Sequence, residues 1–591
     1  MSRTFWLLLL LVILLRAPFL DQAVQGDDIY YLAGAQHAQI DPLHPTHTRY
    51  VFLGDLVDMR GHPHPPLNAW ILGALLWAIG DVNEVAFHAA YILFSLIAVA
   101  SMWMLARRFS PQPVWATLLF IATPAFVING NSFESDIPFL AFWMAGVALV
   151  VLDGPVWLAV VTLAAAALTA YQAIFLTPIL CVYAWLYRRN SVRGWMLAFV
   201  PPLAIGAWLV WEWAASGALP VAVLGGHLTK YGFQAIRNKI NNAVALSVHA
   251  LWIVFPLLWI PAIAKIKQER NREVLFLTAW SALFFLGALV VFFAGSARYL
   301  LPMAAPLALL ASRAPVRWLA PAFAIQLVIS MGLAVVNKQH WAGYREFAQT
   351  LATQARDHRI WINGEWGLRF YLEELGGVAM RSGQAVRPGD VIVTSALGYP
   401  ANFTTGGGSL TRLVEQEIRS SIPLRLIALD TRSAYSTVKN GYWPFDISTG
   451  PIDRVRADVV VEREPTLEYV PMNAPDAEQH LVSGVESLEQ GRYRWMGARA
   501  VVVVKSPATE RPVSASLFLP QQAPARIITL RMDDRVVATK TVPGPGNYTV
   551  ESAPVKPAGR TATITIQVDK TFHAPNDRRE LGAVLAGAGF R

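Results

Sequence analysis

The chain has 591 residues, 54% of them hydrophobic, and a mean hydropathy of +0.39. Soluble domains are about 45–50% hydrophobic, so a wholly soluble protein is excluded and part of the chain must lie in a membrane. The formal net charge of +9 does not indicate nucleic-acid binding, because the basic side chains of the apolar half lie mostly between apolar runs, where they orient membrane spans.

The charged residues divide the chain in two. Residues 1–337 carry 19 basic and 14 acidic side chains, whereas the shorter stretch 338–591 carries 30 and 26. The sequence therefore predicts a membrane domain over residues 1–337, followed by a water-soluble tail.

Apolar runs of the first domain predict membrane-spanning helices, although several are shorter than the roughly 20 residues that a perpendicular span needs. No small-residue cleavage site follows the first run, which predicts an uncleaved anchor. In chain order the eleven runs are residues 5–20, 85–105, 114–127, 137–152, 156–170, 173–187, 195–214, 243–264, 274–293, 300–310 and 318–336.

The basic residues support this number of spans. With Arg3 on the cytoplasmic side, eleven spans place four further basic clusters on that side and the tail outside. The count of eleven treats residues 67–80 as a re-entrant or interfacial helix on the outer face, and residues 156–187 as two short spans. The clusters are Arg107/Arg108, Arg188/Arg189/Arg193, Lys265/Lys267/Arg270/Arg272 and Arg313/Arg317.

Three external segments result from this topology. The largest is the first loop, residues 21–84, and the others are residues 129–136 and 216–242. This topology predicts an integral membrane protein with its tail on the non-cytoplasmic side.

The tail is expected to hold two domains. Residues 338–480 alternate predicted helices, at 341–356, 366–375 and 410–420, with short apolar bursts at 360–362, 391–393 and 424–429, which is typical of an α/β domain. Residues 487–591 contain alternating runs separated by Pro and Gly, which predict a C-terminal β-sandwich.

An acidic pair follows the first span, within Gly26-Asp27-Asp28-Ile29-Tyr30-Tyr31. Carboxylates close to a membrane and to one another have raised pKa values, so one of the pair could act as a general base. Alternatively, Asp27 caps a helix over residues 28–38, with Asp28 in its first turn. The two interpretations are compatible.

Three further polar groups fall outside by the same topology. His62 and His64 lie in a proline-rich turn, residues 62–67, before the short helix, and could equally be a polar turn at a helix start. Glu134 and Asp136 open the fourth span, where interface solvation and capping are the alternative. Arg298 precedes Tyr299; it could hold an anion or extend among lipid head groups.

Taken in order, these motifs resemble a known family. Asp27-Asp28-x-x-Tyr31, His64-Pro65-Pro66-Leu67, the acid at the fourth span and Arg298-Tyr299-x-x-Pro302 are similar to motifs of bacterial relatives of the protein O-mannosyltransferases and of the lipid A aminoarabinose transferase. These are integral-membrane glycosyltransferases of the C superfamily. The resemblance covers roughly residues 5–336 and implies a polytopic α-helical fold. It also implies localisation in a bacterial inner (plasma) membrane, with the tail on the periplasmic or extracellular side.

The resemblance also implies roles for individual residues. Asp27 would be the catalytic base or the carboxylate that orients the acceptor, Asp28 would assist it, and Tyr31, Glu134 and Asp136 would belong to the same site. His64, Arg298 and Tyr299 would bind the donor phosphate. Relatives often carry a lysine between the fifth and sixth spans, where this chain has Tyr171-Gln172, so Lys230 or Lys239 would supply part of that charge.

The sequence does not assign a cofactor. No nucleotide-binding motif is found, and no cofactor is certain. Some relatives bind a divalent metal, for which the candidate ligands here are His62, His64, Asp136 and His249, without a diagnostic spacing.

The function predicted from the sequence is transfer of a sugar from a polyprenyl-phosphate donor to a glycan, lipid or protein acceptor on the outer side of the membrane. A single displacement would make it an inverting hexosyl- or pentosyltransferase. The alternatives are a transporter or flippase of lipid-linked sugars, which predicts polar residues at mid-membrane depth, and a non-catalytic envelope protein.

Overall fold

The computed structural model describes residues 2–62, 64–220, 222, 232–269, 271–292, 295–433, 435, 441–574 and 579–591. They form two compact units. The first unit, which is mainly helical, comprises Met1–Tyr50, Val57–Arg345 and Glu417–Asp453; the second comprises Val51–Leu56, Glu346–Gln416 and Arg454–Arg591. The stretch Glu417–Asp453, which we call the return segment, therefore packs with the helical unit although it lies within the predicted soluble tail.

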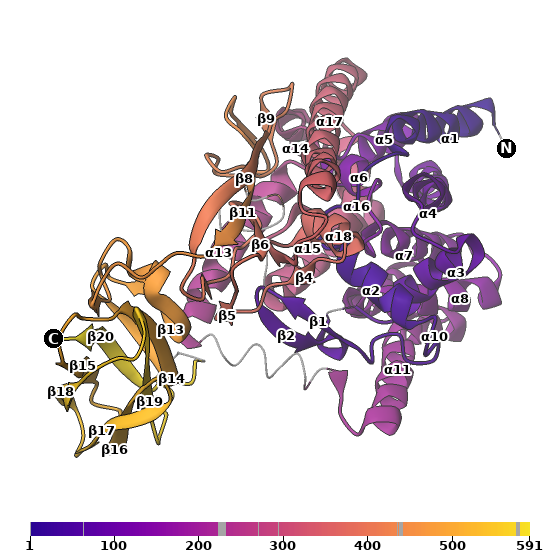
Figure 1. Ribbon diagram of the computed structural model, residues 1–591. Coiled ribbons are helices and arrows are strands. Elements are labelled where there is room, and N and C mark those ends of the chain that lie inside the picture. Colours follow the sequence, from indigo (N-terminus) through magenta and orange to yellow (C-terminus); the bar gives the residue numbers. More distant parts are fainter. Residues whose placement is uncertain are drawn as a thin grey trace. The chain divides into compact units, whose positions relative to one another are not determined.

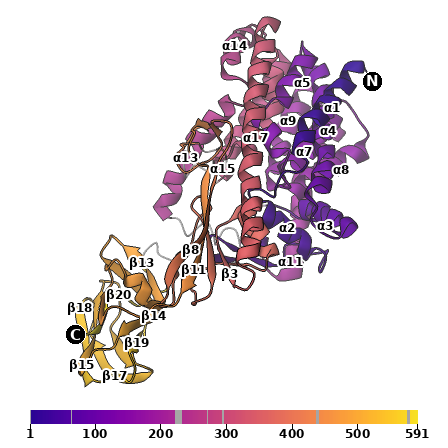
Figure 2. The same cartoon turned by 45° about the horizontal axis from the view of Figure 1, so that its top comes forward.

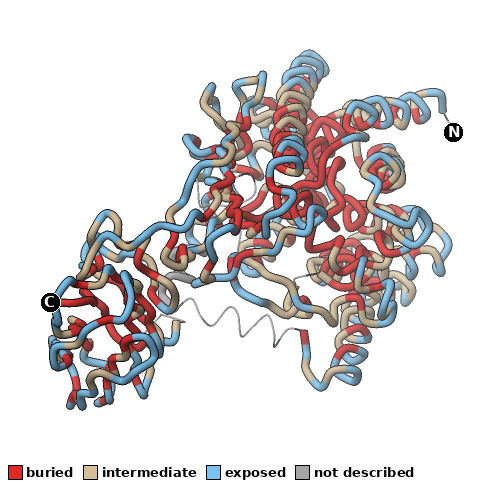
Figure 3. The backbone as a smooth tube through the Cα atoms, viewed as in Figure 1, coloured by how far each residue is buried: buried red, intermediate tan, exposed pale blue. Residues whose placement is uncertain are grey.

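The apolar runs form helices, as predicted. Outside them, α2 (Asp28–His37) and α3 (Leu67–Ile79) lie in the first loop. Figure 1 labels these helices, and Figure 3 shows that buried residues lie in this unit and also in the C-terminal β-rich part. The other helices are α1 (Arg3–Arg16), α4 (Glu84–Phe109), α5 (Pro113–Ile121), α6 (Pro124–Asn129), α7 (Asp136–Val151), α8 (Val156–Thr169), α9 (Leu176–Tyr187), α10 (Val192–Ala198), α11 (Val200–Ser216), α13 (Gly232–Leu251), α14 (Trp259–Gln268), α15 (Arg272–Val291), α16 (Leu301–Ala311) and α17 (Val316–Gln354).

Three helices of the described chain, α4, α15 and α17, are long and apolar enough to cross a membrane, and two bent pairs of helices raise the number to five. The bends are 41° between α10 and α11 and 71° between the helices on either side of residues 252–255. Five shorter apolar helices accompany them. The chain thus has the character of an integral membrane protein, and eleven spans stay a prediction.

Two predictions of helix extent differ from the structure. Residues 114–127 divide into α5 and α6, because Pro124 lacks an N–H group and disfavours a helical conformation at the preceding Thr123. In the opposite sense, α17 is one helix of 39 residues, seen along its length in Figure 2. The predicted span at 318–336 and residues 341–354 of the predicted helix at 341–356 are parts of it, and the predicted boundary at residue 337 lies inside it.

The second unit contains a five-stranded sheet in the order β4-β3-β6-β11-β8. Its strands are β4 (Val378–Ala379), β3 (Ile360–Asn363), β6 (Val391–Ser395), β11 (Asp453–Val461) and β8 (Ser409–Ile418), and α18 (Trp366–Glu374) follows β3. Strand β3 pairs in parallel with β4 and β6, and β11 pairs antiparallel with β6. This part is mixed α/β, as expected.

The predicted helix at 410–420 is wrong, because these residues form strand β8 at the edge of that sheet. The spacing of Leu410, Leu413 and Val414 suits a helix. Salt bridges to β11 favour the strand instead: Arg412 Nε lies 2.8 Å from Asp458 Oδ1, and Arg454 Nε lies 3.4 Å from Glu415 Oε1.

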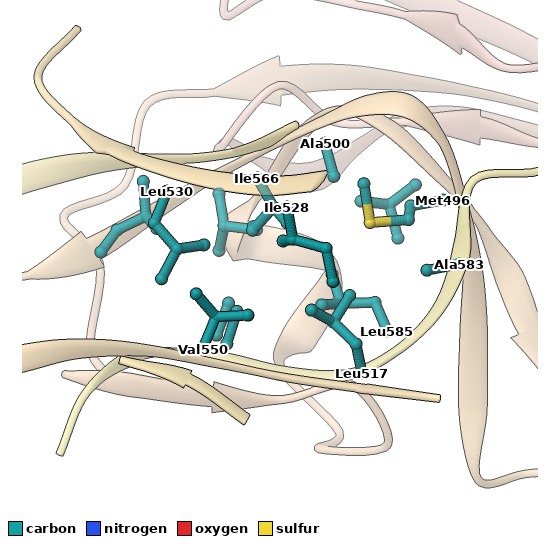
Figure 4. Packing of buried hydrophobic residues seen from close by; sticks show 14 of the residues in the cluster. Met496, Ala500, Leu517, Ile528, Leu530, Val550, Ile566, Ala583 and Leu585 are labelled. Carbon is teal, nitrogen blue, oxygen red and sulfur yellow. The ribbon is translucent and has the colours of Figure 1, made fainter. Parts of the chain in front are cut away.

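The C-terminal β-rich part is one nine-stranded antiparallel sheet that encloses an apolar core. Figure 4 shows residues such as Met496, Leu517 and Ile566 pointing into this core from strands on opposite sides. The sheet begins upstream of residue 487, since β12 and β13 pair with β20 and β14. The strands are β12 (Tyr469–Pro471), β13 (Leu481–Glu489), β14 (Tyr493–Lys505), β15 (Arg511–Leu519), β16 (Arg526–Met532), β17 (Arg535–Val542), β18 (Gly546–Val555), β19 (Thr561–Val568) and β20 (Ala583–Phe590).

Candidate active site

A cluster of ionisable residues lies where three segments of the helical unit meet. Asp27 directly precedes α2, Glu134 and Asp136 lie at the start of α7, and Arg298 lies in the short 3-10 helix Ala297–Leu300 before α16. The three segments are more than 100 positions apart in sequence, and the fold brings the four side chains together.

Arg298 is the centre of the cluster. Its Nη2 donates a hydrogen bond of 3.0 Å to Asp27 Oδ2, and its Nη1 forms an ion pair with Glu134 and lies 3.8 Å from Asp136 Oδ2. The guanidinium also lies over the ring of Tyr299, 5.5 Å from the ring centroid. One arginine thus faces three carboxylates.

Asp27 stands at the N-cap position of α2, but its side chain makes no capping hydrogen bond. Its Oδ2 contacts Arg298 instead, and its backbone N–H donates to Glu134 Oε1 at 3.1 Å. The backbone at Gly26 passes close to Glu134: a Cβ at this position would lie 2.9 Å from Glu134 Oε1. Gly26 also has a φ of +44°, which favours glycine. The Asp27 carboxylate therefore pairs with Arg298 and does not cap α2.

Asp28 has different surroundings from its neighbour. Its carboxylate is fully buried and accepts hydrogen bonds from the Gln25 N–H (3.1 Å), the Ser132 hydroxyl (2.8 Å) and the Phe133 N–H (2.8 Å). Burial raises the pKa of Asp28 to about 7. Its contacts join the start of α2 to residues 132–133, so this side chain holds the segment that carries Glu134.

Aromatic and imidazole rings pack beside the carboxylates. The ring centroids of Tyr31, His62 and His64 lie 5.1–5.4 Å from one another. The Ser135 hydroxyl lies 3.2 Å from the Tyr31 hydroxyl and 2.9 Å from His64 Nδ1. Loss of hydration on burial lowers the pKa of His62 to about 4 and that of His64 well below its usual value. Both imidazoles are neutral at pH 7, so His64 offers hydrogen bonds there and no positive charge.

A cavity of about 50 Å³ opens beside this cluster. Glu134 and Arg298 line it together with residues of α17 and of the return segment. One of these, Tyr435, donates a hydrogen bond of 2.6 Å to Asn129 Oδ1, and its carbonyl accepts from the Ser296 hydroxyl and the Ala297 N–H, both at 3.0 Å.

The sequence did not predict Tyr435, Asn129 or Ser132 as site residues. Asn129 and Ser132 belong to a polar run in a predicted external segment, and that run could have indicated them as site residues. No sequence pattern indicated Tyr435, because it lies in the return segment, far along the chain in the predicted soluble tail.

Three predicted site residues lie elsewhere or outside the described part. Lys239 Nζ donates to the carbonyls of Val290 (2.6 Å) and Phe292 (2.8 Å). His249 is buried in the last turn of α13. Lys230 lies outside the described residues. Within the ranges that the structure describes, no group of three or more His, Cys, Asp or Glu side chains is arranged to hold a metal ion.

No family model and no curated protein sequence matches the chain. Among solved structures it is similar to ArnT from Cupriavidus metallidurans bound to undecaprenyl phosphate, at 13% identity and a TM-score of 0.46, over 70% of this chain and 97% of that one. The apo form of ArnT gives 14% identity and a TM-score of 0.43, over 66% and 92% of the two chains. Arabinofuranosyltransferase AftD from Mycobacteria gives 11% identity and a TM-score of 0.35, over all of this chain and 58% of that one.

Proposed function

We propose that this chain is an integral-membrane glycosyltransferase that moves a sugar from a polyprenyl-phosphate donor to an acceptor hydroxyl on the outer face of the membrane. The observation that carries the proposal is the contact between Arg298 and Asp27 in one partly buried cluster. An arginine suits the phosphate of the leaving group, and a carboxylate beside it suits the proton of the attacking hydroxyl.

The proposed reaction is a single displacement. The acceptor oxygen attacks the anomeric carbon while its proton passes to the Asp27 carboxylate. The bond between that carbon and the phosphate oxygen breaks, and its electron pair leaves with the polyprenyl phosphate. Arg298 stabilises the negative charge on the departing phosphate. Attack from the face opposite the phosphate inverts the anomeric centre.

Donor binding must rearrange the cluster. Arg298 is paired with Asp27 and Glu134, and the neutral His62 and His64 add no positive charge. A donor phosphate therefore competes with these carboxylates for the guanidinium. Release of Asp27 from Arg298 would at the same time make that carboxylate a better proton acceptor, because a paired carboxylate has a lower affinity for protons. Donor binding and activation of the base are thus coupled.

Two alternative functions make predictions that differ from those of a transferase. A transporter or flippase of lipid-linked sugars would move the donor without breaking its sugar–phosphate bond. A non-catalytic envelope protein would need neither residue. The Asp27–Arg298 cluster favours the transferase over both, since it joins a proton acceptor to a phosphate-binding side chain.

The test uses the purified full chain in nanodiscs. Binding of undecaprenyl phosphate should weaken about 10-fold or more in Arg298→Ala, the usual scale for loss of a charge-assisted contact of about 1.5–3 kcal/mol. Arg298→Lys should recover only part of the affinity, because the two-pronged geometry of the guanidinium is lost. Arg317→Ala, which changes a basic residue of the predicted cytoplasmic side, is the control. Equal affinity in the wild type and Arg298→Ala would contradict the donor-phosphate role.

A further inference from the structure

The return segment carries exposed apolar side chains, although the sequence predicts it to be part of a soluble tail. Among its described residues, Trp443 is 57% exposed and Ile447 is 72% exposed, and Leu429 and Tyr442 are exposed as well. Isolated apolar side chains are ordinary on a soluble surface. What covers these four side chains therefore depends on where in the fold the segment lies.

Contacts with α17 give the position of the return segment along that helix. The Ser421 N–H donates a hydrogen bond of 3.0 Å to Gln339 Oε1. Three residues later, Leu424 packs against Gly332, where an added Cβ would lie 3.0 Å from Leu424 Cδ1. The seven positions from Gln339 to Gly332 correspond to about 10 Å of helix. The segment therefore runs back along α17, away from the second unit's end of that helix.

This part of α17 is its apolar part. No charged residue lies between Arg317 and Lys338, a length of about 30 Å, which equals the thickness of the hydrocarbon core of a bilayer. Gly332 is six positions inside Lys338, or about 9 Å below that end of the apolar stretch for a perpendicular helix. Leu424 thus packs on α17 at the depth where lipid head groups meet the acyl chains.

The side chain that pairs with Leu424 continues an exposed apolar surface. Ile447 is the cross-strand partner of Leu424 in a two-stranded ribbon, and directly opposed residues lie on the same face of such a ribbon. On α17, Val328 is one turn from Gly332 on the same helix face, and it is 71% exposed. If α17 crosses a bilayer, lipid covers Val328, and Ile447 lies about one turn further toward the membrane surface.

A second candidate span also contacts the return segment. The Tyr442 hydroxyl donates a hydrogen bond of 3.0 Å to Asn241 Oδ1 in α13. The Phe445 ring packs edge-on against Trp252, which directly follows α13, with ring centroids 5.0 Å apart. The helices on either side of Trp252 form one of the two bent apolar pairs. The return segment is therefore held between two apolar helices of the helical unit.

A buried arginine satisfies backbone groups of the segment at this depth. Arg425 is 1% exposed and donates to the carbonyls of Ile422 (2.7 Å), Leu424 (2.8 Å) and Gly450 (2.8 Å). Non-helical backbone is tolerated below the head groups only where its polar groups find partners in the protein. Arg425 supplies such partners to both arms of the ribbon.

Two exposed charges limit how deep the segment can lie. Asp430 and Arg432 are exposed, and charged side chains are costly in the hydrocarbon core. The level that suits these charges together with exposed Tyr442 and Trp443 is the membrane–water interface, where tyrosine and tryptophan are enriched. Apolar surfaces that bind at this level are buried by about 5–10 Å, which agrees with the depth of Leu424.

We infer that the return segment is a membrane-interface anchor, whose exposed aromatic and apolar side chains insert between the head groups and the upper acyl chains of the lipid bilayer. The same segment carries Tyr435, whose carbonyl accepts from Ser296 and Ala297 beside Arg298. The anchor thus fixes a part of the predicted tail to the membrane next to the candidate active site. It does not depend on the proposed chemistry.

The experiment measures the depth of single labels in the full chain in nanodiscs. In a Cys181→Ala background, Trp443→Cys and Ile447→Cys are each labelled with a bimane fluorophore. Quenching is measured with iodide in water, with lipid carrying a nitroxide near the head group, and with lipid carrying it near the end of the acyl chain. Val328→Cys is the control within the bilayer. Ile527→Cys, at a 41% exposed position of the C-terminal sheet, is the control in water.

Labels at Trp443→Cys and Ile447→Cys should lose more fluorescence to the nitroxide near the head group than to the one near the chain end. Iodide should quench both less than it quenches Ile527→Cys. The label at Val328→Cys should respond most to the nitroxide near the chain end. Each variant is used only with a melting temperature equal to that of the Cys181→Ala parent, and each of the two positions tests the inference by itself.

Two results would overturn the inference while leaving the proposed function intact. Iodide quenching equal to that at Ile527→Cys, with no response to either nitroxide lipid, would place the return segment in water. Protection from iodide without a response to either lipid would show that protein, such as a second copy of this chain, covers the segment instead. Loss of glycosyl transfer by Arg298 or Asp27 variants tests the proposed function separately.

Discussion

Replacing Asp27 with asparagine tests the proposed chemistry with little change of shape. Asparagine cannot accept the proton of an acceptor hydroxyl, and it is as good an N-cap residue as aspartate. The Asp27 side chain makes no capping hydrogen bond, and its backbone N–H, which donates to Glu134 Oε1, is retained in the variant. The substitution therefore changes the charge and the basicity of one side chain at the site.

The expected effects on turnover and on binding have opposite directions. Turnover should fall about 10²–10⁴-fold, the usual contribution of a positioned general base. The affinity for undecaprenyl phosphate should stay the same or rise by up to about 5-fold, because the ion pair with Arg298 at 3.0 Å no longer competes with the phosphate. A partly exposed pair is worth about 0–1 kcal/mol, which sets that upper limit.

The assay measures single-turnover transfer and lipid binding on the same nanodisc preparation. Asp58→Asn is the control, since Asp58 lies in the same loop and forms its own ion pair with Arg60. Near-normal transfer by a folded Asp27→Asn protein would refute the catalytic assignment. Loss of lipid binding in that variant, with normal transfer per bound donor, would make Asp27 a binding residue instead.

Three further expectations concern other parts of the chain. Asp28→Ala should lower stability by about 1–3 kcal/mol, seen as a lower melting temperature, because three donors lose a buried acceptor; an unchanged melting temperature would contradict this role. Burial lowers the pKa of His62 to about 4, so on acidification the unfolded chain protonates this imidazole first, near pH 6.5. The stability present above pH 6.5 should therefore decrease as the pH falls toward 4, and it should decrease less in His62→Gln. Parallel curves of melting temperature against pH for the two proteins would refute this expectation. With Cys181 replaced, an impermeant thiol reagent on intact cells should label a cysteine at Ser382 and not one at Gln268; labelling at Gln268 would reject the eleven-span topology.

The sequence predicted elements well where one physical signal dominated. Apolar runs predicted the helices, and alternation predicted strands of the nine-stranded C-terminal sheet, because burial in lipid or in a sheet imposes those patterns directly. The positive-inside rule placed Asp27, Glu134 and Arg298 in one compartment, and the structure brings the three side chains into contact.

Other features of the fold depend on contacts between distant parts of the chain, which no local sequence pattern indicates. The strand β8 has helical spacing of its leucines, and its partner β11 lies more than 30 residues further along the chain. Tyr435 reaches the site through hydrogen bonds to Asn129 and Ser296. The different contacts of Asp27 and Asp28 follow from the direction of each side chain, which adjacent positions in a sequence do not determine.

The continuity of α17 places a constraint on chain length. Asn337, His340, Trp341 and Tyr344 occupy positions i, i+3, i+4 and i+7, so they share one face of the helix, and the first three line the cavity. One residue inserted upstream, within 322–336, would turn this face by about 100° and advance it by about 1.5 Å. Since 3.6 residues make a turn, insertions of about seven residues would restore the phase, at the cost of a helix two turns longer. The number of residues between Pro321 and Asn337 should therefore vary in whole turns among functional chains, while loops elsewhere vary freely.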